Sequence, residues 1–426
     1  MSTVTTGSDP KPALAPTTPP VTLLVTVFGA DRPGVTAGLF ATLDPYGVEV
    51  ADVEQVVLRG RLVLGVLVSA PAEEPQLRLA LHKWAFTEGL DIEVVSGHGD
   101  NRPRREGRTH VTVLGSPLRS SALAALAGRI AACHGNIDRI VRLAKYPVTA
   151  IELDVSGADP DLLRAELASV AAAEQVDVAV QRAGLSRRAK RLVVMDVDST
   201  LIEGEVIEEL AARAGCLEQV ATITQAAMRG ELDFAGSLRA RVALLAGLDA
   251  SALEDVRRSV RLMPGARTLI RTLKRLGYRI AIVSGGFTHV TDSLRDELGL
   301  DFALANTLEI GADGKLTGRV VGEIVDRAGK AEALRRFAAE AGVPVADTVA
   351  IGDGANDLDM LAAAGLGVAF NAKQVVREQA DTAVNVPFLD TILYLLGITR
   401  EEVEAADSED ASRRTAAARG GTLTVM

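Results

Sequence analysis

The sequence predicts an α/β protein in which a parallel sheet with helices on both faces follows two smaller α+β segments of the ferredoxin-like type. Short runs rich in Val and Ile alternate with helical patterns over 190–398, which is typical of a parallel sheet. Residues 21–98 and 108–182 each read as β-α-β-β-α-β, the ferredoxin-like order. A long, mostly helical stretch, about 203–263, interrupts the third segment after its first strand.

The two front segments form an internal repeat. Thr26-Val27-Phe28-Gly29 matches Thr112-Val113-Leu114-Gly115. Each copy continues with a helical stretch, a turn glycine and two runs of alternating apolar residues, which are typical of half-buried strands. The expected helices are Val35–Leu43 and Leu123–Cys133, and the expected strand pairs are Val53–Leu58 with Leu62–Val68 and Ile140–Leu143 with Val148–Val155.

The third segment contains three short apolar runs, each followed by polar residues or glycine: Leu192–Met195, Arg279–Val283 and Thr348–Ile351. We expect these runs to be parallel strands. Ala305–Ile310 and Lys315–Val321 flank a Gly-Ala-Asp-Gly turn and predict a β-hairpin.

Shifts in composition mark the boundaries of the segments. The polar, basic stretches 99–107 and 184–191 separate the three folded parts. Residues 1–20, rich in Pro and Thr, predict a disordered leader. The charged, Ala-rich and Arg-rich residues 400–426 predict a loose tail.

Charge and cysteine content limit the partners and the compartment. The formal net charge of -10 argues against nucleic-acid and anionic-membrane partners, because both require a basic surface. The chain has no apolar run long enough to span a membrane, and its N-terminus lacks the pattern of a secretory signal. The two cysteines, Cys133 and Cys216, are typical of a reducing compartment. We therefore expect a cytoplasmic protein.

Polar residues follow each of the three expected parallel strands. Asp196 and Asp198 follow the first strand, Ser284 and Gly285 the second, and Asp353 the third. In addition, Lys330 lies near the start of the expected helix Lys330–Ala341, and Asn356 and Asp357 come three and four residues after Asp353. Because ligands bind at the carboxyl ends of parallel strands, we expect four separate elements to deliver these groups to one edge.

Three acidic residues and one lysine at this edge fit phosphoryl transfer to a carboxylate. A carboxylate that attacks a phosphate dianion is repelled by it, and Mg²⁺ bound by carboxylate oxygens removes much of that repulsion. The expected metal ligands are Asp196, the main-chain carbonyl of Asp198, and Asp353. Asp196 is the expected nucleophile, which forms an aspartyl-phosphate, and Asp198 the expected general acid and base.

The remaining groups at this edge fit binding roles. Lys330 would neutralise the phosphoryl oxygens, while the hydroxyl of Ser284 and the amide of Gly285 would donate hydrogen bonds to them. Asn356 and Asp357 would orient the substrate or the groups around the metal. Each motif alone has an ordinary explanation as a turn, a helix cap or a solvated lysine, and only their joint order favours a catalytic site.

Taken together, the motifs Asp196-Val197-Asp198-Ser199-Thr200-Leu201, Ser284-Gly285-Gly286, Lys330 and Gly352-Asp353-Gly354-Ala355-Asn356-Asp357 resemble those of the haloacid dehalogenase superfamily, and more narrowly of phosphoserine phosphatases. The resemblance covers about 190–398. It implies a Rossmann-like core with a small helical cap after the first strand, Mg²⁺ as cofactor and O-phospho-L-serine as substrate.

The helical stretch supplies residues suited to that substrate. Phosphoserine carries an ammonium and a carboxylate, so a selective site needs an acid and an arginine. Glu205 could hold the ammonium and Arg241 the carboxylate, while Met228 and Phe234 could exclude water. These four match the substrate contacts of the resembled pattern. The ordinary alternatives are a helix-terminal charge for Glu205, a solvated helix face for Arg241, and cap core for Met228 and Phe234.

The front segments resemble ACT domains, which bind amino acids and regulate metabolic enzymes. Gly29-Ala30-Asp31-Arg32-Pro33-Gly34-Val35 fits the ACT turn, with Gly29 and Asp31 as candidate effector contacts, whereas the second copy departs from it after Gly115. The resemblance implies a homodimer through the ACT domains and an effector such as L-serine. Alternatively, both copies only build an oligomer interface.

The order of tandem ACT domains before a phosphatase resembles the long, actinobacterial form of phosphoserine phosphatase. It implies hydrolysis of phosphoserine in the last step of serine biosynthesis, with feedback by serine. Two alternatives stay open: a phosphatase of another small phosphomonoester or of phosphoproteins, and an amino-acid sensor without catalysis.

Overall fold

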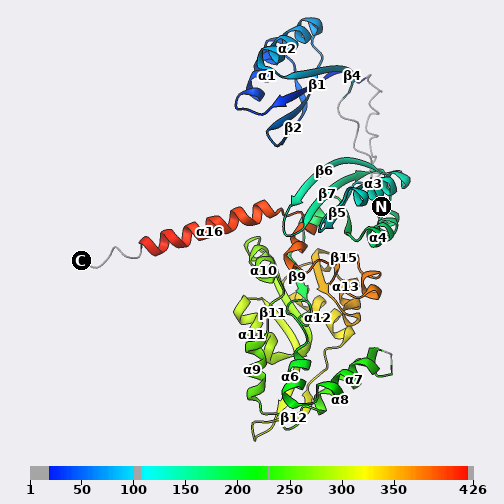
Figure 1. Ribbon diagram of the computed structural model, residues 1–426, viewed down its shortest axis with the longest axis vertical. Helices are drawn as coiled ribbons and strands as arrows, with labels where there is room; N and C mark the ends of the chain where they lie inside the picture. The colour runs from blue at the N-terminus through cyan, green and yellow to red at the C-terminus, as the bar shows by residue number, and fades with distance from the viewer. Residues whose placement is uncertain (1–18, 100–106, 229–230, 421–426) are drawn as a thin grey trace, which may run out of the picture. The chain divides into compact units, whose positions relative to one another are not determined.

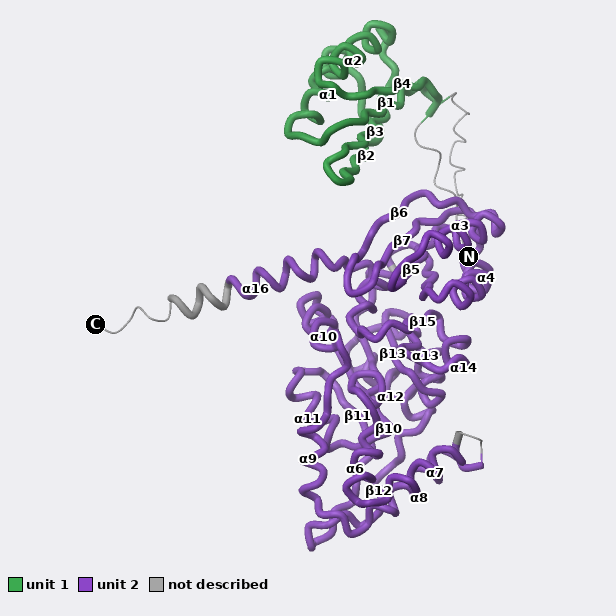
Figure 2. The backbone as a smooth tube through the Cα atoms, viewed as in Figure 1, with its two compact units in different colours: residues 1–104 green, residues 105–426 purple. Residues whose placement is uncertain are grey.

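The computed structural model describes residues 19–99, 107–228 and 231–420, and its helices and strands are labelled in Figure 1. Most of the expected leader, residues 1–18, lies outside the described residues. The chain divides into two compact units, residues 1–104 and 105–426 (Figure 2). Each unit is described by itself.

The first unit has the expected ferredoxin-like order. Its strands pair antiparallel in the order β2-β3-β1-β4, and one face of the sheet is buried under the two helices through residues such as Leu23, Val25 and Leu39. The alternation of apolar residues predicted this arrangement. Its elements are β1 (Val21–Ala30), α1 (Val35–Leu43), the 3-10 helix η1 (Asp44–Tyr46), β2 (Val50–Leu58), β3 (Arg61–Ser69), α2 (Glu74–Glu88) and β4 (Asp91–His98).

The second unit begins with the repeat of this fold. The strands follow the order β8-β5-β7-β6, the counterpart of the order in the first unit, so the β-α-β-β-α-β prediction is confirmed for both copies. The elements are β5 (Thr109–Gly115), α3 (Ser120–Ala132), β6 (Asn136–Ala144), β7 (Thr149–Ser156), α4 (Pro160–Glu174) and β8 (Asp177–Arg182).

A parallel sheet forms the centre of the remaining chain. Its first strand, β9 (Leu192–Met195), is central and pairs parallel with both β10 (Arg279–Phe287) and β13 (Thr348–Gly352). The strand alternates between two cores: Val193 and Met195 pack on one face, Leu192 and Val194 on the other. The continuous apolar run therefore reflects a strand that is buried on both faces.

Helices cover both faces of this sheet, and short elements extend it. They are the short α5 (Leu185–Arg188) before β9, then α10 (Ala266–Arg275), α11 (Thr288–Leu298), β11 (Phe302–Ile310), β12 (Leu316–Val321), α12 (Arg327–Glu340), η2 (Val345–Asp347), η3 (Ala355–Asp357), α13 (Leu358–Ala363), β14 (Gly367–Phe370), α14 (Gln374–Arg377), β15 (Thr382–Val384), η4 (Leu389–Thr391) and α15 (Ile392–Leu395). The antiparallel pairing of β11 with β12 confirms the predicted hairpin.

The helical stretch after β9 forms a separate cap. It consists of α6 (Val206–Ala214), α7 (Leu217–Met228), α8 (Phe234–Ala243) and α9 (Ser251–Ser259). The chain enters and leaves the cap side by side, since Ile202 and Leu262 form an antiparallel bridge. The expected inserted cap is thus present, and two adjacent linkers connect it to the sheet.

The second ferredoxin-like segment and the parallel sheet share one continuous sheet. β15 pairs antiparallel with β8 through Thr382 and Ala179, and the combined sheet has 11 strands. The basic stretch 184–191 was expected to separate these segments. Arg187 of that stretch is instead buried, and its guanidinium donates to Leu395 O at 3.0 Å and bonds Glu152 at 2.5 Å.

The expectation of a loose C-terminal tail is wrong for its described part, because Arg400–Gly420 forms the helix α16. Thr399 and Glu402 make a reciprocal capping box: Thr399 N donates to the Glu402 carboxylate at 2.7 Å and Glu402 N to the Thr399 hydroxyl at 3.2 Å. Farther along, Asp407 accepts from Arg271 Nε at 3.0 Å and pairs with Arg275 at 2.6 Å. A cap and ion pairs to α10 thus stabilise this charged segment as a helix.

No helix in the described parts of the chain is long and apolar enough to cross a membrane.

Candidate active site

The carboxyl ends of β9, β10 and β13 bring the predicted residues together. Asp196 follows β9 directly and is 4% exposed. Its amide donates to Ile351 O at 2.8 Å, which continues the ladder with β13, and its carboxylate accepts from Val197 N at 2.7 Å. Neighbouring strands therefore fix the position of this carboxylate before any ligand binds.

Lys330 lies beneath Asp196 and is fully buried. Its Nζ is 2.8 Å from Asp196 Oδ1 and 2.6 Å from Asp357 Oδ1. Burial opposes the charge on this ammonium, but the carboxylates of Asp196 and Asp357 outweigh burial and raise the pKa of Lys330. α12 presents the lysine because Asp326 caps its N-terminus and accepts from Gly329 N at 2.9 Å.

The side chain of Asp198 contacts the carboxyl end of β10 and the start of α6. Its carboxylate accepts from the Ser284 hydroxyl at 2.9 Å and from Val206 N at 2.8 Å. Ser284 Oγ in turn accepts from Gly286 N at 2.7 Å. Burial raises the pKa of Asp198, although these hydrogen bonds oppose the shift.

Asp196, Asp353 and Asp357 form an acidic group in which one carboxylate oxygen from each residue lies within 4.8 Å of the other two. Burial and then the charge of Asp357 raise the pKa of Asp353 to about 6, and burial raises the pKa of Asp196 well above its usual range. Asp196 and Asp357 are buried and Asp353 is half-buried, and the single ammonium of Lys330, which pairs with Asp196 and Asp357, does not neutralise three carboxylates. This donor set of hard oxygens fits a divalent cation such as Mg²⁺.

Asp357 was expected to orient groups around the metal, whereas the geometry places its carboxylate within the acidic group. It also accepts from Gly354 N at 2.9 Å. The helix α13 begins only after the 3-10 turn η3, so Asn356 and Asp357 lie on a tight turn rather than on the helix face that the sequence suggested. The side chain of Asp198 stands outside this group, and its main-chain carbonyl stays a predicted ligand.

The cap supplies Glu205, Phe234 and Arg241 to the same place. Burial, followed by the charges of Asp198 and Asp353, raises the pKa of Glu205 to about 8. The Ser199 hydroxyl donates to the Glu205 carboxylate at 3.2 Å. Burial lowers the pKa of Arg241, against the attraction of Glu205. An acid and an arginine of the cap thus line the same cavity as Asp196 and Asp198.

A cavity of about 610 Å³ lies between the cap and the carboxyl ends of the strands. Gly285 forms part of its floor, and a Cβ there would lie 2.8 Å from the ring of Phe234, so a glycine is needed where the cap approaches. Predicted residues that line the cavity are Asp196, Asp198, Glu205, Phe234, Arg241, Gly285, Asp353 and Asn356. The side chain of Met228, the last residue of α7, lies outside the part that the structure describes.

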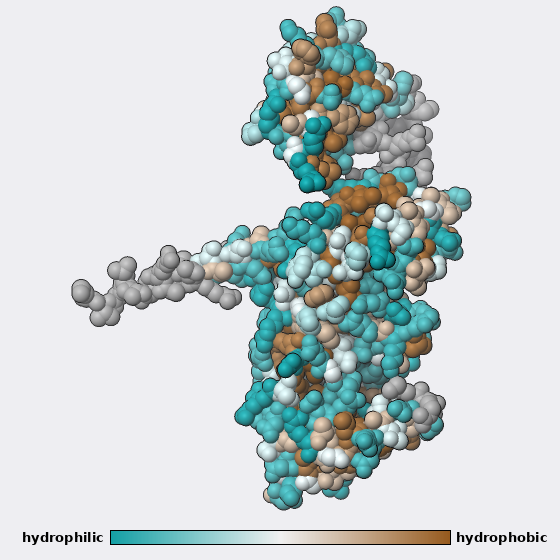
Figure 3. Space-filling view, in the orientation of Figure 1, coloured by the Kyte–Doolittle hydropathy of each residue, from teal (hydrophilic) through white to brown (hydrophobic). Residues whose placement is uncertain are grey.

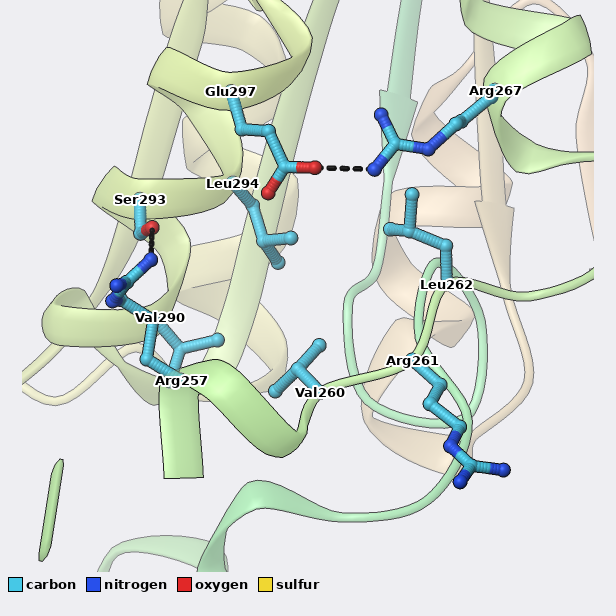
Figure 4. A pocket seen from close by; sticks show the side chains of 9 residues that line it. All are labelled: Arg257, Val260, Arg261, Leu262, Arg267, Val290, Ser293, Leu294 and Glu297. Carbon is cyan, nitrogen blue, oxygen red and sulfur yellow. Dashed lines mark hydrogen bonds and ion pairs between the residues drawn. The ribbon is translucent and has the colours of Figure 1, made fainter. Parts of the chain in front are cut away.

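A second cavity, of about 270 Å³, lies between α9, α10 and α11 (Figure 4). Arg257 donates to the Ser293 hydroxyl at 3.2 Å, and Arg267 pairs with Glu297. These ion-paired and hydrogen-bonded side chains belong to the helix packing, and none of the predicted catalytic residues lines this cavity.

Sequence reasoning missed two buried residues that support the site. Thr200, fully buried, donates to Asp353 at 3.2 Å. Asn306, 1% exposed, donates from Nδ2 to Gly285 O at 2.8 Å and accepts from Val325 N at 2.8 Å. Asn306, on β11, thereby ties the carboxyl end of β10 to the segment that leads into α12. Thr200 stands four residues after Asp196 and could have been found from the motif, whereas Asn306 carries no local signal.

The candidate effector residues lie in the first unit, at the turn between β1 and α1. Asp31 N donates to Gly60 O at 2.8 Å. Gly29 lies against Leu90, whose Cδ2 would be 2.2 Å from a Cβ at that position. The turn ends at Gly34, whose φ of 98° is a conformation that favours glycine.

Family models match three parts of the chain. Residues 193–362 match the haloacid dehalogenase-like hydrolase model. Residues 21–95 and 108–181 match two ACT domain models. The hydrolase match covers the strands from β9 to β13 and the acidic edge, and the ACT matches cover both ferredoxin-like copies.

Two relatives extend the similarity over most of the chain. A phosphoserine phosphatase of Streptomyces coelicolor is 69% identical over 91% of this chain and 95% of its own. One from Mycobacterium tuberculosis is 56% identical over 92% of this chain and 97% of its own. The chain therefore belongs to the phosphoserine phosphatase family of haloacid dehalogenase-like hydrolases with two ACT domains.

Solved structures agree with this placement. A HAD family hydrolase of Salmonella enterica serovar Typhi is 30% identical, with a TM-score of 0.60, over 68% of this chain and 98% of its own. A probable phosphoserine phosphatase from Vibrio cholerae is 35% identical, with a TM-score of 0.54, over 70% of this chain and 88% of its own.

Proposed function

We propose that this protein hydrolyses O-phospho-L-serine to L-serine and phosphate. The observation that carries the proposal is one cavity that joins two kinds of groups: Asp196 and Asp198 on its floor, and Glu205 and Arg241 from the cap. The floor fits the phosphate, and the cap pair fits an α-amino acid.

In the proposed reaction an Asp196 oxygen attacks the phosphorus, and the bond from phosphorus to the serine oxygen breaks. Asp198 gives its proton to the departing serine oxygen; its raised pKa favours the protonated form that this step requires. Asp198 then takes a proton from water, which attacks the aspartyl-phosphate and releases phosphate. Asp196 is returned as a carboxylate.

Lys330 and the carboxyl end of β10 would stabilise the negative charge of the phosphoryl group during both steps. Lys330 contacts Asp196 at 2.8 Å and would neutralise the phosphoryl oxygens, to which the Ser284 hydroxyl and the Gly285 amide would donate. Asp196 and Asp353, with the main-chain carbonyl of Asp198 and assisted by Asp357, would hold Mg²⁺. The cation would supply positive charge against the repulsion between carboxylate and phosphate.

Glu205 and Arg241 would select the substrate. Glu205 is half-buried beside other acids and its pKa is raised to about 8, so a cation at this position is favoured, and the α-ammonium of phosphoserine is such a cation. Arg241 would hold the α-carboxylate with two parallel hydrogen bonds, and Phe234, with Met228, would exclude water.

The test is phosphate release from a panel of esters. We expect phosphoserine to be preferred over phosphoethanolamine, which lacks the carboxylate, and over phospholactate, which lacks the ammonium. Activity should require Mg²⁺, stop with EDTA and be lost in Asp196→Asn. Equal rates on the three esters would refute the roles of Glu205 and Arg241, and turnover by Asp196→Asn would refute the mechanism.

For the ACT domains we propose homodimer formation and feedback by L-serine, with Gly29 and Asp31 among the effector contacts. The sheet face of the first unit that the helices leave uncovered exposes Leu24 (43%), Val63 (41%) and Val95 (49%), and apolar residues also gather at the surface over β6 of the second unit (Figure 3). Covering such faces with a second copy would bury apolar area. Analytical sedimentation tests the dimer, and phosphatase activity with and without serine tests the feedback. A monomer whose rate does not change with serine would refute both proposals.

A further inference from the structure

The first residue of β8 makes two short hydrogen bonds to the catalytic sheet. Asp177 belongs to the second ACT domain and is 7% exposed. Its carboxylate accepts from Asn385 N at 2.7 Å and from Asn385 Nδ2 at 2.6 Å. A buried carboxylate with two donors from one residue fixes that residue closely, so the ACT domain holds the end of β15.

The end of β15 lies at the same edge as the active site. β15 runs parallel to β14, so its carboxyl end shares the edge where Asp196 and Asp353 lie. β8 runs antiparallel to β15, which places the start of β8, and with it Asp177, at this edge. An acid of the ACT domain thus faces the catalytic edge rather than the far side of the sheet.

Two hydrogen bonds connect the end of β15 with the chain segment that lines the cavity. Asn371 N, in the loop after β14, donates to Val384 O at 2.8 Å. Arg377, the last residue of α14, donates to Asn385 Oδ1 at 3.4 Å. This loop and helix form one wall of the substrate cavity, through Lys373, Val375 and Val376.

We infer that Asp177 is a positioning residue for the substrate cavity: through Asn385 it sets the place of the wall that Lys373 and Val375 form. The second ACT domain therefore completes the catalytic domain's binding site without touching the substrate. The proposed phosphoserine hydrolysis serves only as the assay for this inference, which rests on the contacts from Asp177 to α14.

The test exploits the chemical symmetry of the pair. Asp177→Asn leaves one amide facing the Asn385 amide and loses a hydrogen bond. In the double variant Asp177→Asn with Asn385→Asp, the amide and the carboxylate exchange places, so every hydrogen bond can form again, including that from Arg377. Asp161→Asn, an exposed acid of the same domain with 63% side-chain exposure, is the matched control.

We expect Asp177→Asn to raise KM about three- to tenfold with kcat within about twofold, the size of effects transmitted through such contacts. The double variant should return KM to within about twofold of the wild-type value. The control Asp161→Asn should have the wild-type KM. Hydrogen exchange of the amides in 371–380 should rise in the single variant and recover in the double one. This second readout needs no substrate, so it tests the inference even if phosphoserine is not hydrolysed.

Two results would overturn the inference: unchanged KM and exchange in Asp177→Asn, or a single-variant defect that the exchanged pair fails to repair. Should Asp177→Asn not fold, Arg377→Met tests the same connection from the side of α14. Arg377→Met should raise both KM and the amide hydrogen exchange of residues 371–380, as Asp177→Asn does. Wild-type KM and wild-type exchange in Arg377→Met would also refute the role of Asp177.

Discussion

Replacing Asp353 with asparagine should make the metal-free protein more stable, although it removes a proposed metal ligand. Burial and the neighbouring Asp357 raise the pKa of Asp353 from its usual 3.8 to about 6. Ionising this group in the folded state therefore costs about 2–3 kcal/mol more than in the unfolded chain, allowing for its partial exposure. Asparagine has nearly the same shape and avoids that cost.

The pH dependence has a definite sign. Because the folded-state pKa lies above the unfolded one, the folded protein keeps this proton to higher pH, and stability is lost as pH rises from 3.8 toward about 6. The penalty is nearly complete at neutral pH and close to zero at about pH 3, where Asp353 is largely protonated in both the folded and the unfolded state. The gain in Asp353→Asn should follow the same course.

The assay is urea unfolding in EDTA at neutral pH and at about pH 3, followed by far-UV circular dichroism. Asp353→Asn should be more stable than the wild type by about 2–3 kcal/mol at neutral pH and equal to it in acid. Adding Mg²⁺ should stabilise the wild type far more than the variant. Asp255→Asn, an exposed acid of α9, controls for net charge. A variant that is less stable in EDTA at neutral pH, or one with the same gain in acid, would refute the reasoning.

Three further outcomes are expected. Arg241→Lys should raise KM for phosphoserine about tenfold or more, because a lysine cannot form the paired hydrogen bonds of a guanidinium, while phosphoethanolamine kinetics stay unchanged. Asn306→Ala should lower kcat/KM about tenfold or more and cost about 1–3 kcal/mol of stability, since Gly285 O and Val325 N lose their partner; urea unfolding beside kinetics checks both. Arg275→Ala should cost about 1 kcal/mol and speed proteolysis within 400–420, and unchanged cleavage would contradict the docking of α16.

The catalytic edge could be predicted because its information is local. Asp196, Ser284 and Asp353 each follow a short buried strand, and the ends of parallel strands necessarily meet. The contact of Lys330 with Asp357 at 2.6 Å was harder to predict from the sequence. Asp357 was expected on the face of a helix, but α13 begins only at Leu358. The side chain of Asn306 joins two loops by tertiary contacts alone, and no spacing in the sequence indicates it.

The C-terminal helix shows a different limit. Composition suggested a loose tail, although the Thr399 and Glu402 capping box stands in the sequence and marks a helix start. What the sequence could not show is the partner: Asp407 meets Arg271 and Arg275 from 132 to 136 residues away. A charged helix of low apolar content is stable here because another helix supplies its counter-charges.

The sequence did not indicate the sheet that the second ACT domain shares with the catalytic domain, because a single residue pair joins β8 to β15. Without β8, the three-residue β15 would be an edge strand with unpaired backbone groups, and the ACT sheet would likewise end in an open edge at β8. Pairing Thr382 with Ala179 closes both edges at once. A chain cut at 190, where composition places the boundary, would reopen the edge of β15 and free Asn385 from Asp177. We therefore expect the isolated segment 190–398 to bind substrate more weakly and aggregate more readily than the full chain, and equal KM and solubility would show that the boundary in composition is also the boundary in function.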